Sequence, residues 1–153
     1  MTKEQLIKLV SENIKVLRAE YDYSQQAMAN AIGLSKKTLI QVEKERLLLS
    51  WTATCAACAV FKSSKFLNMT LGGDPTALVE AMAHKYCYTD STTVERGNLF
   101  WDILQNNGEY VLEKNIISEH YRIIDDKGRR LFSTFDLQKA NAVYVKYIEK
   151  GEN

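Results

Sequence analysis

The chain has 153 residues, of which 46% are hydrophobic and 25% charged, and this composition is that of an ordinary globular protein. A chain of this length forms one medium domain or two small ones and can bury a core unaided. No apolar run reaches the roughly 20 residues that a membrane helix needs. The three cysteines are an odd number, which argues against a disulfide framework. We therefore expect a cytoplasmic protein.

Charge is unevenly distributed along the chain. Residues 1–69 hold ten Lys or Arg against six Asp or Glu, a balance of +4, whereas residues 70–153 hold ten against thirteen, a balance of −3. Together they give the net charge of +1. The basic N-terminal half favours a phosphate-bearing partner, with a chance difference between the halves as the alternative.

The first helix is predicted over residues 3–21, where apolar residues recur at helical spacing: Leu6, Val10, Ile14 and Leu17. Residues 24–43 then predict two short helices. Ser24 is an N-cap for the first of them, Gly33 ends it, and Ser35 caps the second. Two short helices joined by a tight Gly-containing turn form a helix-turn-helix, whose second helix can lie in the DNA major groove.

The order of residues in SQQAMANAIGLSKKTLIQVE closely resembles the phage repressor and Cro-like (XRE) family of transcriptional regulators. The resemblance covers roughly Leu6 to Leu71. It implies that Gln25 binds a phosphate and that Glu43 is structural. The sequence departs from the family pattern at Glu45 and Leu49, where a Gly and a Pro are usual, and at Ile40, where a polar residue is more usual.

The same resemblance implies that the start of the second helix faces the bases and flanking phosphates. Elementary chemistry agrees, because Lys bonds guanine, Gln reads adenine, and a Thr methyl can touch a thymine methyl. A solvated surface pair is the alternative interpretation of the two adjacent lysines. The predicted DNA-binding residues are Gln25, Ser35, Lys36, Lys37, Thr38 and Gln41, with Lys44 and Arg46 as further phosphate contacts.

Two further helices are predicted before a break in the pattern. Ser50 caps one that runs from Trp51 to about Phe61, and a short one from Ser63 or Ser64 ends at Leu71. Gly72-Gly73 marks the expected domain boundary. The prediction is a five-helix DNA-binding domain over residues 1–71 and a small α+β domain over residues 74–153.

The C-terminal half changes character part-way through. Asp74-Pro75 starts a helix expected to reach about Tyr86, and a second helix is predicted over residues 93–105. Aromatic and β-branched runs then predict a three-stranded antiparallel meander over residues 110–114, 120–124 and 129–133, followed by a helix over residues 136–150. The many aromatic residues indicate a core, with a ligand pocket or a dimer interface as the alternative.

Cysteine and histidine residues suggest no catalyst or metal site. Cys55 and Cys58 could form a zinc set with His84 and Cys87 by spacing alone, but a pair inside an apolar helix favours packing. His120 has no Ser, Cys or Asp arrangement around it that suggests a triad. We expect no enzyme, no metal and no cofactor.

The sequence as a whole predicts a double-stranded DNA-binding transcriptional regulator, acting as a repressor and a homodimer on a pseudo-palindromic operator. Two alternatives remain open at this point. One is an antitoxin or phage-type interaction protein whose C-terminal domain binds a protein partner. The other is a sensor whose C-terminal aromatic residues bind a small effector.

Overall fold

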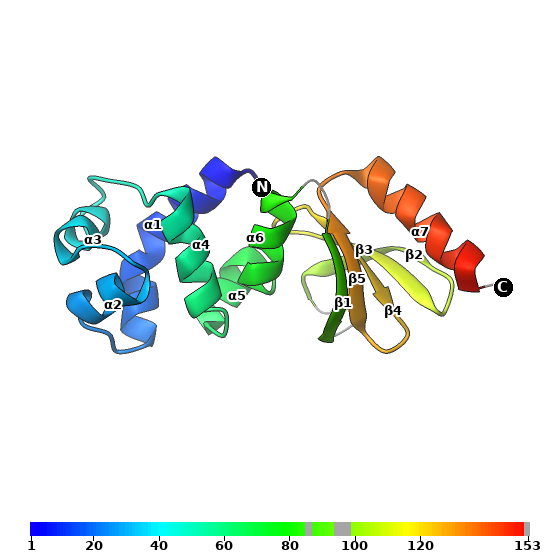
Figure 1. The fold of residues 1–153 in the computed structure, drawn as a ribbon, viewed down its shortest axis with the longest axis horizontal. Coiled ribbons are helices and arrows are strands. Elements are labelled where there is room, and N and C mark those ends of the chain that lie inside the picture. The colour runs from blue at the N-terminus through cyan, green and yellow to red at the C-terminus, as the bar shows by residue number, and fades with distance from the viewer. Residues whose placement is uncertain (85–86, 94–98, 152–153) are drawn as a thin grey trace. The chain divides into compact units, whose positions relative to one another are not determined.

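Figure 1 shows the computed structural model of the chain, which describes residues 1–84, 87–93 and 99–151. The chain divides into two compact units, Met1–Val79 and Glu80–Asn153. The first unit is helical, and the second combines a sheet with a helix, so the fold is mixed α+β. In the described part of the chain, no helix is both long and apolar enough to cross a membrane.

The first unit is built from consecutive helices: α1 (Lys3–Glu20), α2 (Gln25–Ala31), α3 (Lys36–Glu43), α4 (Trp51–Val60), α5 (Lys65–Leu71) and the start of α6 (Pro75–Ala83). The expected count of five helices is therefore not matched, because α6 begins within the same compact unit. α1 begins with a capping box, in which the Thr2 hydroxyl accepts from the Gln5 N–H at 3.2 Å. α1 also caps another helix, because the Glu20 carboxylate accepts from the Lys65 N–H at 2.8 Å and from the Ser64 hydroxyl. The end of α1 is thereby fixed to the start of α5.

The core of the first unit is centred on α1. Its predicted apolar stripe is fully buried: Leu6, Val10, Ile14 and Leu17 are each at most 1% exposed. Each other helix adds residues to this core, and α4 does so with small side chains, Ala53, Ala57 and Cys58. The loop before α4 is held by Ser11, whose hydroxyl accepts from the Leu49 N–H at 2.9 Å.

The second unit is a five-stranded antiparallel sheet, with strand order β1-β5-β4-β3-β2, and one helix. Its elements are β1 (Cys87–Thr93), β2 (Trp101–Asn106), β3 (Tyr110–Asn115), β4 (Tyr121–Asp125), β5 (Arg129–Thr134) and α7 (Leu137–Gly151). The predicted meander corresponds to β3, β4 and β5, but the expectation of only three strands is wrong. Strands β1 and β2 flank the meander on its two sides.

The helix predicted over residues 93–105 is also wrong where the structure describes it. Thr93 ends β1 and residues 101–106 form β2, whereas residues 94–98 lie outside the described part. β2 lies at the edge of the sheet, and all of its residues after Trp101 are exposed. An edge strand of this kind lacks the alternation of apolar and polar residues that identifies a strand. The preceding helix ends at Ala83, and residues 85–86 of its expected end are not described.

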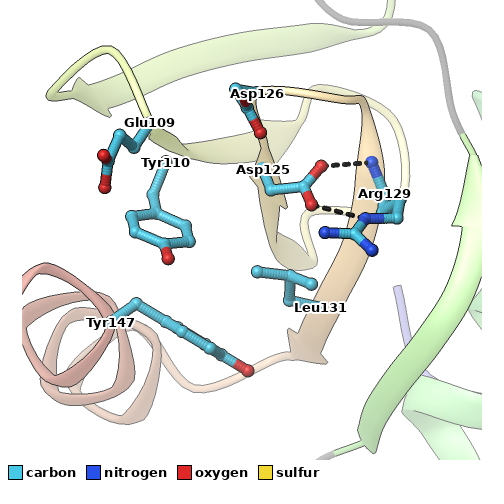
Figure 2. Close-up of a pocket in the computed structure, with 7 residues that line it drawn as sticks. All are labelled: Glu109, Tyr110, Asp125, Asp126, Arg129, Leu131 and Tyr147. Atoms are coloured by element: carbon cyan, nitrogen blue, oxygen red, sulfur yellow. Dashed lines mark hydrogen bonds and ion pairs between the residues drawn. The ribbon is translucent and has the colours of Figure 1, made fainter. Parts of the chain in front are cut away.

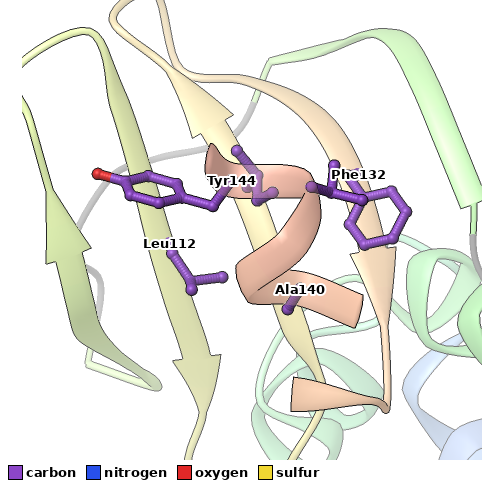
Figure 3. Packing of buried hydrophobic residues seen from close by; sticks show 6 residues of the cluster. Leu112, Phe132, Ala140 and Tyr144 are labelled. Carbon is purple, nitrogen blue, oxygen red and sulfur yellow. The ribbon is translucent and has the colours of Figure 1, made fainter. Parts of the chain in front are cut away.

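One row of side chains holds the second unit together. Leu112, Ile123 and Phe132 are directly opposite one another on β3, β4 and β5, and each is fully buried. Figure 3 shows Leu112 and Phe132 of this row on the strands that α7 covers, and α7 contributes Ala140 and Tyr144 to the same cluster. This row joins the three central strands to α7.

Truncating this row will destabilise the second unit. Leu112→Ala is expected to lower the free energy of unfolding by about 2–5 kcal/mol, because it leaves a cavity beneath α7. Leu137→Ala is the matched control, because Leu137 is 43% exposed, and it should cost less than about 1 kcal/mol. Denaturant unfolding followed by Trp101 fluorescence in a Trp51→Phe background measures this unit. Equal losses for both variants would contradict the assignment of the core.

Candidate nucleic-acid interface

The helix-turn-helix consists of α2, the turn at residues 32–35, and α3. Both helices start at a serine N-cap: Ser24 accepts from the Ala27 N–H at 3.1 Å, and Ser35 accepts from the Thr38 N–H at 3.0 Å. Gly33 ends α2 in the left-handed conformation, with φ of 73°. Each capping residue therefore has the role that its position in the sequence predicts.

The end of α3 has the same geometry as the end of α2, although it has no glycine. The Glu45 N–H donates to the Val42 carbonyl at 2.8 Å, and the Arg46 N–H donates to the Gln41 carbonyl at 2.9 Å. These two bonds are a Schellman closure, and Glu45 takes the left-handed conformation at φ of 57°. The loop after α3 thus closes with Glu45 at the position where the phage repressor family usually has Gly.

A buried ion pair joins three helices behind this surface. The Glu43 carboxylate on α3 accepts from the Arg18 guanidinium on α1 at 2.5 Å and from the Gln25 amide on α2 at 2.7 Å. The Glu43 side chain is 5% exposed. Burial alone would raise the pKa of Glu43, but the hydrogen bonds from Arg18 and Gln25, with the nearby cationic charge, hold it below its ordinary value. Glu43 is therefore ionised at neutral pH.

The two sides of α3 differ in polarity. Leu39 and Val42 are buried, whereas Lys36 and Lys37 are exposed in the first turn, where the helix dipole is positive. Ser35 is exposed beside them, and Thr38 and Gln41 are half-buried. The Ser35 and Thr38 hydroxyls lie 2.8 Å apart. The cationic start of α3 is thus open to a ligand, while the opposite side anchors the helix.

The remaining predicted DNA contacts lie at the ends of α2 and α3. Gln25 is half-buried and tied to Glu43, but a side-chain amide has two N–H groups, so one of them can still donate to a phosphate. Lys44 is the C-cap of α3, and the Arg46 backbone N–H takes part in the closure of that helix. The side chains of both residues are exposed. The predicted residues therefore share one helix pair and the loop that follows it.

The cysteines of α4 are packing residues in this structure. Cys58 is buried, and burial raises the pKa of its thiol to about 12. Burial also raises the pKa of the half-buried Cys55. A thiol that stays protonated is neither a good nucleophile nor a metal ligand. Within the described residues no cluster of His, Cys, Asp and Glu could hold a metal, and the Cys87 side chain lies outside that part.

A buried polar cluster in the second unit was not predicted. Glu113 on β3 and Arg122 on β4 are opposite each other and form an ion pair of 2.6 Å. The Arg122 guanidinium lies 3.7 Å from the centre of the Trp101 ring. His120 packs edge-on against Trp101, and burial together with the charges of Arg122 and Arg130 lowers its pKa to about 3. His120 therefore stays neutral, and the cluster is structural in character.

The only sequence signal for this cluster is that Glu113 and Arg122 fall inside predicted strands. Two charged residues in otherwise apolar or aromatic runs suggest a charged pair across neighbouring strands. Trp101 could not be included, because residues 101–105 were predicted to be helical. The pairing depends on the register of β3 against β4, and periodicity alone does not fix it.

Comparisons with known proteins give no assignment. No family model matches the chain, and no curated protein or solved structure matches it significantly. The resemblance of residues 24–43 to the phage repressors therefore stands on the residues of the motif themselves.

The strained end of α3 yields a stability prediction. Glu45→Gly is expected to raise the free energy of unfolding by about 1 kcal/mol, because glycine adopts the left-handed conformation without a steric penalty. Glu45→Ala removes the same charge and keeps the strain, so it should give no such gain. Denaturant unfolding followed by Trp51 fluorescence in a Trp101→Phe background measures the first unit. Equal effects of Gly and Ala would show that charge, not backbone strain, is responsible.

The Glu43 ion pair gives a prediction with a pH dependence. Because the pKa of Glu43 is lowered in the folded state, its stabilisation is fully present above the unfolded pKa near 4.5 and is lost as pH falls through the lower folded value. Glu43→Gln should lower the free energy of unfolding at pH 7 by about 1.5–3 kcal/mol. The difference in the free energy of unfolding between this variant and the unsubstituted chain should become smaller below pH 4.5.

Glu12→Gln is the matched control, because Glu12 forms an exposed pair with Lys8 and exposed pairs contribute little. Both variants are compared with the unsubstituted chain by urea unfolding between pH 3 and 7. A Glu43→Gln effect that does not change with pH would show that the carboxylate charge is not what stabilises the three helices.

Proposed function

We propose that the chain is a sequence-specific, double-stranded DNA-binding transcriptional regulator that acts as a repressor. The observation that carries this proposal is the polarity of α3. Lys36 and Lys37 are exposed at its capped N-terminus, while Leu39 and Val42 are buried on its opposite side. A helix held from behind, with cations on its outer N-terminal turn, has the properties needed to enter the major groove.

The dimensions and chemistry of α3 suit this role. Eight residues make a helix about 12 Å long, comparable with the width of the major groove. Lys36 or Lys37 would bond guanine, and Gln41 would read adenine through a bidentate amide contact. Gln41 lies three residues after Thr38 and shares its side of the helix, so these two can reach neighbouring base pairs.

Phosphate contacts would set the orientation of the helix-turn-helix on the DNA. The second N–H group of the Gln25 amide, and Lys44 and Arg46 beyond the end of α3, are suitable donors. Arg18 and Glu43 would act indirectly, because their ion pair joins α1 to α3 and the Gln25 amide joins α2 to the same carboxylate. A single helix reads too few base pairs for selectivity, so we propose a homodimer on a two-fold symmetric operator.

Salt dependence tests the phosphate contacts directly. If each half-site neutralises about four phosphates, the affinity of the dimer for duplex DNA should fall with salt at a log–log slope of roughly −7. Lys37→Ala should weaken binding by about 1–3 kcal/mol if Lys37 contacts a base, and should lower the slope by about 1 for each lost phosphate contact. Fluorescence anisotropy with a labelled duplex between 50 and 300 mM salt measures both quantities.

Lys62→Ala is the matched control, since Lys62 is an equally exposed lysine in the turn between α4 and α5. It should change neither the affinity nor the slope. If Lys37→Ala and Lys62→Ala behaved alike, binding would reflect general basic charge, and α3 would not be the reading helix. If the chain bound no DNA even at 50 mM salt, the interaction-protein alternative would replace the proposal.

A further inference from the structure

Two cavities of the second unit share one wall, the side chain of Tyr147 on α7. The larger has a volume of about 430 Å³ and lies among the turns before β3 and β5, with three carboxylates in its lining: Glu109, Asp125 and Asp126. Figure 2 shows these carboxylates around the cavity, with Tyr110 and Tyr147 on one side and Arg129 on the other. The smaller cavity, of about 200 Å³, has Tyr88, Lys146 and Lys150 in its lining.

The larger cavity has an excess of negative charge. Asp125 is neutralised by Arg129, whose Nε donates to it at 2.6 Å, and it also accepts from the Lys127 and Arg129 backbone N–H groups. The carboxylates of Glu109 and Asp126 remain exposed at the cavity. Tyr110 and Tyr147 stack with their ring centroids 5.4 Å apart. Carboxylates beside aromatic rings suit an ammonium group on a long apolar stem.

The smaller cavity has the opposite charge. Lys146 and Lys150 are one helical turn apart on α7, and both are exposed. Tyr88, 60% exposed, packs on Phe132 and gives this cavity an aromatic wall. Lys127 follows Asp126 and Glu149 precedes Lys150 in the chain, so each reduces the charge of the cavity beside it by one, whereas each lining has an excess of two charges. The charge difference between the cavities therefore comes from their linings.

We propose that this surface binds a second copy of the chain, with Lys146 and Lys150 of each copy entering the acidic cavity of the other. A two-fold axis near Tyr147 exchanges the two cavities, so a surface that carries both signs side by side is complementary to itself. A small cation would satisfy only the acidic cavity, and a small anion only the basic one. Tyr88 and Tyr147 would provide the aromatic centre of the interface.

The inference concerns association of the chain with itself and does not require the proposed DNA binding. The test is sedimentation of the full chain without DNA at about 20 μM and 50 mM salt. We expect the mass of a dimer for the unsubstituted chain. Lys146→Glu/Lys150→Glu makes both cavities acidic, and Glu109→Lys/Asp126→Lys makes both basic. Each variant alone should show a dissociation constant raised at least about tenfold, because like charges then meet.

An equimolar mixture of these two variants should restore the dimer, because acidic and basic cavities again face each other on both sides of the axis. Lys8→Glu/Lys62→Glu is the control, with the same change of charge on exposed lysines of the first unit. It should leave the mass of the dimer unchanged. Circular dichroism checks that each variant is folded.

Three results would overturn the proposal. A monomeric mass for the unsubstituted chain would remove the second copy as the occupant. A dimer that both reversed variants keep would place the interface elsewhere. A mixture that stays monomeric, although each variant is folded, would show that the two cavities do not meet each other.

Discussion

The hydrogen-bonded ion pair between Arg18, Glu43 and Gln25 is the constraint on which the first unit depends. It joins α1, α2 and α3 through one nearly buried carboxylate. Breaking such a pair leaves an uncompensated charge in the interior, so the three helices are held in one arrangement. The outward direction of Lys36 and Lys37 follows from this arrangement, because α3 cannot turn about its axis without exposing Leu39 and Val42. The direction of the exposed lysines in the proposed interface is therefore determined by interior residues that need not contact DNA.

The second unit is organised by a different principle. One side of its sheet is an apolar row packed beneath α7, and residues of the alternate register, Glu113 and Arg122 among them, form a buried polar cluster with Trp101. A buried charged pair contributes little net stability but penalises alternative strand pairings. A slip of one residue between β3 and β4 would place Glu113 and Arg122 on opposite faces of the sheet, with one of the two charges toward α7. We infer that the polar cluster helps to define the register, while the row beneath α7 supplies most of the stability.

The sequence predicts the first unit well because its signals are local. Serine caps, the glycine after α2 and apolar stripes each act within a few residues, and α1 to α5 begin and end close to where those signals lie. The partners of Glu43 could not be predicted in this way, because Arg18 is 25 residues away in the chain. In the second unit β1 and β2 were missed, and β2 is an exposed edge strand that has no alternation of apolar and polar residues to identify it. The left-handed backbone conformation of Glu45 could not be predicted either, because no neighbouring residue indicates that a glutamate will adopt it.

The most direct test of the account is the selection of bound duplexes from a random DNA pool at about 150 mM salt, using the full chain and a variant in which Lys36, Lys37 and Gln41 are all replaced by Ala. The account predicts a two-fold symmetric consensus with half-site centres about 10 base pairs apart, or a multiple of that spacing, and its loss in the variant. No enrichment, or the same enrichment with both proteins, would contradict it. In that case the helix-turn-helix would be a scaffold, and the surface of the second unit would become the principal candidate for function.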